Sequence, residues 1–134
     1  MNFNLAREPW SDTAATVLTP VCADTPGGLE DIAGQVRRGN ASLFRVSSQE
    51  KLVGYYVVRI DSLNVGDELV IIAGAGKLPD FDLVAVMLPI LEAQAEISGC
   101  KSVRIHTNRK GMVNKISRRG FCFSEWVFRK ELNK

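Results

Sequence analysis

The sequence predicts a single α/β domain built on a twisted mixed sheet, in which an antiparallel meander leads into a βαβ unit and helices cover both faces. Two patterns carry this prediction. Three segments rich in β-branched and aromatic residues follow one another through short connections, at residues 42–47, 52–60 and 68–73. A long apolar segment of helical periodicity then leads to another strand-like segment, at residues 101–107. Two strands joined through a helix are expected to lie side by side and parallel.

Length and composition fit one domain over residues 1–134, with a helical N-terminal part at 1–40 and the sheet and main helices at 41–134. The chain is 46% hydrophobic and 24% charged, as is typical of globular proteins. We expect a cytoplasmic protein that has no membrane contact, because no apolar segment reaches the ~20 residues of a membrane span and the N-terminus lacks signal-peptide features. Three cysteines without CxxC spacing suggest no metal site and favour free thiols.

The N-terminal part is expected to contain a short strand at residues 1–5 and two short helices. The first helix is expected at residues 11–18, after the turn that contains Pro9. The second is expected at residues 29–38, where apolar side chains share one helical face and Gly39 follows.

The meander follows, with a turn at residues 49–51 and a connection at residues 61–67. The third strand, at residues 68–73, is continuously apolar, as expected of a strand covered on both faces. A loop is predicted at residues 74–79.

The main helix is predicted at residues 80–98, with most of its surface apolar and therefore buried. Pro89 inside it removes a backbone hydrogen bond and costs about 3 kcal/mol unless the helix bends. A basic helix is expected at residues 109–119, and one or two aromatic-rich strands at residues 121–132.

Charge is unevenly distributed along the chain. Residues 101–134 hold ten Lys and Arg against two acids, whereas residues 1–100 hold seven against thirteen. This asymmetry is typical either of a surface that binds nucleic acid or an acidic partner, or of a folded protein whose two faces differ in charge.

The element order and three local phrases resemble the GNAT superfamily of N-acetyltransferases. The phrases are Lys51-Leu52-Val53-Gly54-Tyr55, residues 98–105 and Arg118-Arg119-Gly120-Phe121. The resemblance covers residues 41–132 and, more loosely, the helices before them. In particular, the sequence resembles small GNAT-like proteins encoded among phage head and tail genes.

This resemblance implies an acetyl-CoA site at the start of the main helix, on a loop of the form Gln/Arg-x-x-Gly-x-Gly/Ala. The glycines let the pyrophosphate approach the backbone N–H groups. The loop should fall on residues 79–84, where Asp82 and Val84 occupy the glycine positions and Pro79 the first position. Asp80 and Asp82 suit the positive end of the helix but repel a pyrophosphate. The expected function is therefore a GNAT-fold protein that has lost acetyl transfer, needs no cofactor and serves in binding or assembly, in a phage virion if it is phage-encoded.

The alternative is an active N-acetyltransferase that moves an acetyl group from acetyl-CoA to an amine with an atypical CoA loop. Its catalytic residues would be Glu68 as base, with Tyr56 and His106 as proton donors. The family's usual acid position is occupied by Ile116. A displaced phosphate loop at residues 74–77 would supply most of the cofactor contacts, which would come from Ile72, Ala73, Gly74, Gly76 and Lys77.

A protein partner is expected on a surface that includes Lys115, Arg118, Arg119 and Trp126. A second alternative is a nucleic-acid binder that uses the basic helix, and it requires an affinity that falls steeply with salt.

Overall fold

A computed structural model describes residues 2–22, 27–77, 82–107, 110–125, 128, 130 and 132. Its helices and strands follow the predicted order. They are β1 (Asn4–Glu8), α1 (Asp12–Cys22), α2 (Gly28–Arg37), β2 (Ser42–Ser48), β3 (Lys51–Leu63), β4 (Gly66–Gly76), α3 (Leu83–Ile97), β5 (Ser102–Ile105) and α4 (Lys110–Ser117). Among the described residues, no helix is both long and apolar enough to cross a membrane.

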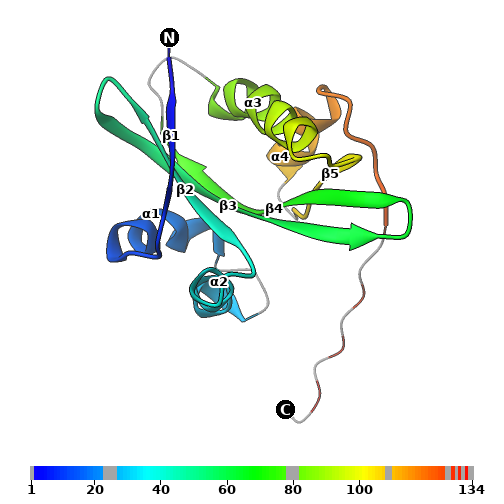
Figure 1. Cartoon of the computed structure of the whole chain (residues 1–134), viewed down its shortest axis with the longest axis horizontal. Coiled ribbons are helices and arrows are strands. Elements are labelled where there is room, and N and C mark those ends of the chain that lie inside the picture. Colours follow the sequence, from blue (N-terminus) through cyan, green and yellow to red (C-terminus); the bar gives the residue numbers. More distant parts are fainter. Residues whose placement is uncertain are drawn as a thin grey trace.

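The five strands form one sheet in the order β1-β2-β3-β4-β5. The first four strands pair antiparallel and β5 pairs parallel to β4, which confirms the meander followed by a βαβ unit. In Figure 1 the twisted sheet runs through the middle, with α1 and α2 on one face and α3 and α4 on the other. The predicted mixed sheet with helices on both faces is therefore confirmed.

Each face of the sheet has its own apolar core, because successive side chains of a strand point to opposite faces. Tyr55 and Val57 of β3 pack with α1 and α2, and we call this side the α1/α2 face. Tyr56 and Val58 pack with α3, and we call this side the α3 face. The run Val53–Val58 is buried throughout for this reason.

Strand β4 changes its pairing halfway along. Val58 lies opposite Ile71 and Val57 lies opposite Ala73, so Ile72 is an extra residue that forms a β-bulge. On the other side, pairing with β5 ends where Ile71 lies opposite Ile105. In the described part of the chain, β4 thus continues to Gly76 with β3 on one side and no strand on the side of β5.

The structure corrects two predicted elements. Residues 74–76 belong to β4 rather than to a loop, because Gly54 to Tyr56 of β3 continue to pair with them; the glycines there break the sequence pattern without ending the strand. Residues 121–125, 128, 130 and 132 adopt no strand. There, Phe121 donates its N–H to the Ile116 carbonyl at the end of α4, and Glu125 forms ion pairs with side chains at the end of the sheet.

The boundaries of the other elements differ modestly from the prediction. Helix α3 begins at Leu83, three residues later than predicted, because Asp82 is its N-cap. The helix retains Pro89 in its interior, and Gly99 follows its end with a φ of 81°, a left-handed conformation that favours glycine. Strand β1 starts at Asn4, and α1 extends to Cys22.

Candidate functional site

The open edge of β4 is the first part of the candidate site. The N–H of Lys77 donates to the Val53 carbonyl over 3.0 Å, which continues the ladder with β3 beyond Gly76. Because hydrogen-bonding residues alternate in an antiparallel ladder, Ala75 also bonds to β3, and the backbone groups of Gly74 and Gly76 point the other way. These backbone groups therefore face the gap beyond the end of β5.

Gly74 and Gly76 of this edge differ in the space that is available for a side chain. A Cβ on Gly76 would lie 2.5 Å from the Val53 carbonyl oxygen and 2.9 Å from the Gly54 Cα, so the close approach of β3 and β4 requires glycine there. A Cβ on Gly74 would meet nothing nearer than the Tyr56 Cβ at 3.6 Å, an ordinary contact. Strand packing alone thus accounts for Gly76, without any ligand.

The start of α3 is the second part of the site, and Asp82 occupies it. Its carboxylate accepts a hydrogen bond of 3.1 Å from the N–H of Val84 and lies 3.5 Å from the Lys115 ammonium of α4. The pKa of Asp82 is lowered: slight desolvation acts to raise it, but hydrogen bonds from the Ala85 and Val84 N–H groups and the charge of Lys115 outweigh that effect. A side chain of the protein itself therefore satisfies the N-terminus of α3. The predictions for Pro79 and Asp80 lie outside the described residues.

Glu68 lies near the other end of β4, in a polar cluster that sequence reasoning did not foresee. The Ser102 hydroxyl donates to its carboxylate over 2.8 Å, and Arg104 Nε lies 3.3 Å from it. Arg104 also pairs with Asp61 at 2.9 Å and with Glu125 at 3.4 Å. With its side chain only 13% exposed, Glu68 is held by these contacts. The alternation of polar residues along the 101–107 segment was the signal that a polar face existed there.

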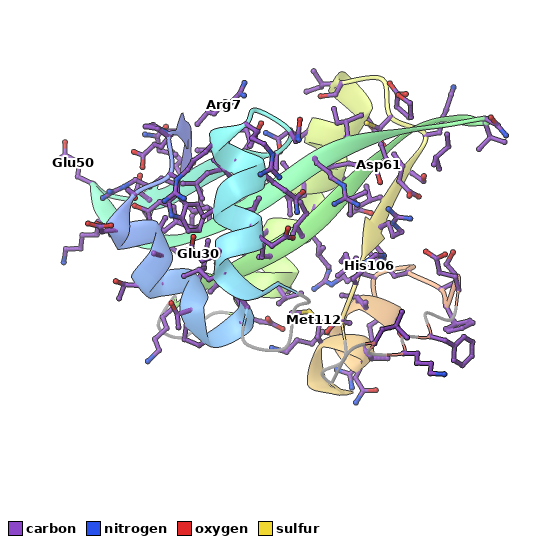
Figure 2. All side chains as sticks on the ribbon, turned by 90° about the horizontal axis from the view of Figure 1, so that it is seen from below. Arg7, Glu30, Glu50, Asp61, His106 and Met112 are labelled. Carbon is purple, nitrogen blue, oxygen red and sulfur yellow. The ribbon has the colours of Figure 1, made fainter. Side chains whose placement is uncertain are left out.

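Asp61 links this cluster to β3. Its carboxylate accepts from Arg59 at 2.8 Å, and this hydrogen bond, together with the charges of Arg59 and Arg104, lowers its pKa despite some desolvation. Arg59 in turn donates to Gln35 of α2 over 3.4 Å. Figure 2 places Asp61 on the β3–β4 hairpin and His106 at the end of β5, on the same side of the molecule.

Tyr56 and His106 are not brought together with Glu68 as a catalytic set. Tyr56 is buried on the α3 face, where its hydroxyl donates to Gln94 over 3.3 Å and its ring stacks on Phe44. Desolvation raises the pKa of Tyr56 to about 12, although the Gln94 hydrogen bond acts in the opposite direction. The His106 side chain is 56% exposed, and its Nε2 lies 4.0 Å from Glu125.

The residues of the predicted partner surface that the structure describes lie on α4 and directly after it. Lys115 faces Asp82, whereas Arg118 and Arg119 are exposed after the end of α4. Trp126 lies outside the described residues. Within the described ranges, no cluster of three or more His, Cys, Asp or Glu side chains could hold a metal ion.

No protein-family model and no curated protein matches this sequence. Solved structures do share its fold. A ribosomal-protein-alanine N-acetyltransferase from Brucella melitensis biovar Abortus 2308 superposes with a TM-score of 0.68 at 12% identity, over 97% of this chain and 98% of that one. An acetyltransferase from Trypanosoma brucei gives 0.66 at 17% identity, over 98% and 100%. An aminoglycoside N-acetyltransferase solved in complex with CoA gives 0.61 at 13% identity, over 99% and 96%.

At identities this low, the likeness establishes the fold and leaves the chemistry to be argued from the side chains. It extends over nearly the whole length of each chain, including the βαβ unit that contains the candidate site. The protein therefore has the GNAT acetyltransferase fold.

Proposed function

We propose that this protein uses the GNAT fold as a non-catalytic binding scaffold and does not transfer acetyl groups from acetyl-CoA. The observation that carries the proposal is the Asp82 carboxylate at the start of α3, which accepts the Val84 N–H and pairs with Lys115. An anion bound at a helix N-terminus needs free N–H groups and a positive potential. Asp82 accepts from one of these N–H groups and lowers the positive potential, and its negative charge repels a pyrophosphate.

The side chains available for chemistry support the same proposal. A general base must be free to accept a proton from the attacking amine. Glu68 is instead engaged by Arg104 and Ser102. A general acid works best with a pKa near the ambient pH. Burial raises the pKa of Tyr56 to about 12, and Tyr56 lies on the opposite face of the sheet from the cluster around Glu68.

The second candidate function is an N-acetyltransferase with an atypical CoA loop. One observation favours it: β4 continues beyond the end of β5, and the backbone groups of Gly74 and Gly76 face the resulting gap. A flat amide-bearing ligand could pair with such an edge as an added strand does. This candidate is left with the exposed His106 as its proton donor, because neither Glu68 nor Tyr56 is placed to act.

Calorimetric titration with acetyl-CoA separates the two candidates. We expect no binding at micromolar concentrations for the wild-type protein. The Asp82→Asn variant keeps the helix cap, since Asn is as good an N-cap as Asp, but removes the charge. It should therefore bind acetyl-CoA at least about tenfold more tightly than the wild type. Micromolar binding by the wild type, with turnover of an amine, would refute the scaffold proposal. Asp12→Asn, which removes an acidic charge from the first turn of α1, is the matched control for loss of such a charge at a helix start elsewhere.

The partner of the scaffold is proposed to be a protein with an acidic surface, which binds Arg118 and Arg119 beyond α4. Both side chains are exposed, and the C-terminal quarter of the chain is strongly basic. A nucleic acid would use the same charges, and its affinity would fall linearly with the logarithm of salt concentration. A filter-binding titration with no such fall excludes nucleic acid. The role in phage assembly stays a prediction from the resemblance.

A further inference from the structure

A groove of about 360 Å³ lies at the opposite end of α3 from Asp82. Its walls come from the C-terminal half of α3, the start of β5 and the turn after α4. The lining residues include Glu92, Ala95, Cys100, Val103, Phe121 and Cys122. We call it the α3–β5 groove. It contains two of the three cysteines of the chain.

The segment after α4 crosses from this groove to the other face of the sheet. Phe121 lines the groove beside Ala95 and Val103, which belong to the α3 face. Four residues later, Glu125 pairs with Arg104 and approaches His106, in the cluster that Asp61 and Glu68 share. Residues 122–124 therefore pass around the outer edge of β5, and Cys122 lies where this crossing begins.

The three thiols differ sharply in access. Cys22 is 1% exposed within the core of the α1/α2 face. Cys100, two residues before β5, is partly exposed, and Cys122 is exposed in a segment without regular structure. Desolvation and the nearby charge of Asp67 raise the pKa of Cys100. An oxidant therefore meets Cys122 first, and Cys100 is the other accessible thiol of the same groove.

We propose that Cys100 and Cys122 form a reversible disulfide that fastens the segment after α4 over the start of β5. The reaction with oxidised glutathione proceeds in two exchanges. The Cys122 thiolate attacks the glutathione disulfide, forms a mixed disulfide and releases one reduced glutathione. The Cys100 thiolate then attacks the Cys122 sulfur and releases the second. Two electrons pass from the protein to glutathione, and the two thiol protons end on the released glutathione molecules.

The bond closes a loop that contains β5 and α4. A disulfide requires Cα atoms within ~7 Å of each other. Cys100 is held in place by the hydrogen bond that its N–H donates to the Ala95 carbonyl at the end of α3. The segment that contains Cys122 has no regular structure, so it is the part that shifts to meet this requirement. The crosslink restricts the unfolded chain, so the oxidised protein should have a higher Tm than the reduced protein. It would also hold α4, and with it Lys115, against α3. This inference does not depend on the proposed scaffold function.

The test is oxidation of the reduced full-length protein with oxidised glutathione, followed by acid quenching, alkylation and intact mass measurement. The wild type should lose two hydrogen atoms in mass, gain no glutathione and form no disulfide between chains, and its Tm should rise until dithiothreitol reverses the change. Cys100→Ser should stop at a single glutathione adduct on Cys122, and Cys122→Ser should form no intramolecular bond. Cys22→Ala is the matched control and should behave as the wild type.

Peptide mapping of the wild type decides the matter even if a variant fails to fold, because it locates the bond directly. A Cys100–Cys122 peptide within one chain supports the proposal. A stable glutathione adduct on Cys122 in the wild type, or a crosslink between two chains only, overturns it. Raising the pH should accelerate the second exchange, since more of Cys100 is then thiolate.

Discussion

The difference between Gly74 and Gly76 provides a direct test of how the β4 edge is built. If residues 74–77 were a phosphate loop, both glycines would serve ligand binding and neither would matter for folding. The structure gives them different surroundings: an added Cβ at Gly76 would lie 2.5 Å from a backbone carbonyl oxygen, whereas at Gly74 the nearest atom lies at 3.6 Å. Both residues have φ values outside the left-handed region, so strain from φ does not complicate the comparison.

We expect Gly76→Ala to be strongly destabilising. Overpacking costs about 1–3 kcal/mol, and the upper end applies because the Val53 carbonyl belongs to the ladder and cannot rotate away as a side chain would. For a chain of this length, about 3 kcal/mol corresponds to a fall in Tm of roughly 9–15 °C. Gly74→Ala should be neutral, or stabilising by about 0.4–1 kcal/mol, because alanine restricts the unfolded chain.

Thermal unfolding followed by circular dichroism measures both variants under one condition. Urea unfolding supplies the free energies and shows whether the m-value is unchanged. Equal stability of the two variants would refute the close approach of β3 and β4 at Gly54 and Gly76. If the two variants were equally stable and both lost acetyl-CoA binding, residues 74–77 would have to be interpreted as a phosphate loop.

Three further predictions concern the polar groups of the sheet. Tyr56→Phe should cost only about 1 kcal/mol in urea unfolding, since the 3.3 Å hydrogen bond to Gln94 is long. Because burial raises the pKa of Tyr56 to about 12, Tyr56 ionises at a lower pH in the unfolded chain than in the folded one. The stability of the wild type should therefore fall as the pH rises above 10, and that of the variant should fall less. Arg59 holds the pKa of Asp61 below 3.8, so stability should be lost as the pH falls below that value, and acid titration of Asp61→Asn should show a shallower loss. Arg104→Met should cost about 2–3 kcal/mol in thermal unfolding by leaving the mostly buried Glu68 carboxylate without its cation, whereas Asp61 keeps Arg59; Arg104→Lys should recover only part of this loss.

The fold could be predicted because its signals are local and repeated. Strand-forming residues at 42–47, 52–60 and 68–73, followed by a helix with an apolar face, fix the element order, and the short connections leave few topologies. The end of β4 could not be predicted, since Gly74 and Gly76 are poor strand formers and only the partner strand β3 holds them in the sheet. The strand predicted for the C-terminal segment is wrong for the converse reason. Its aromatic residues favour a strand, but residues 121–125 make side-chain contacts instead.

The candidate site was predictable only where a residue's contacts are made with its neighbours in sequence. Asp82 was placed correctly at the start of the main helix, because an N-cap depends on neighbours in sequence. The cluster of Asp61, Glu68, Ser102, Arg104 and Glu125 joins two strands of the hairpin, β5 and the segment after α4. No sequence spacing reports such a contact. Glu68 is a candidate base only in the enzymatic alternative, and its engagement by Arg104 is visible only in the folded chain.

The gap beside β4 and the chemistry of the site have separate physical origins in this protein. The gap follows from backbone features, namely the extra residue Ile72 in β4 and the end of β5 at Ile105, and such features survive extensive substitution. The chemistry depends on a few side chains, and one carboxylate at Asp82 is enough to change the potential at the start of α3. A chain can therefore retain this fold over nearly its whole length while the side chains at the start of α3 change. Fold similarity alone is consequently weak evidence for activity, and titration of the wild type and of Asp82→Asn with acetyl-CoA tests the proposed loss of transfer directly.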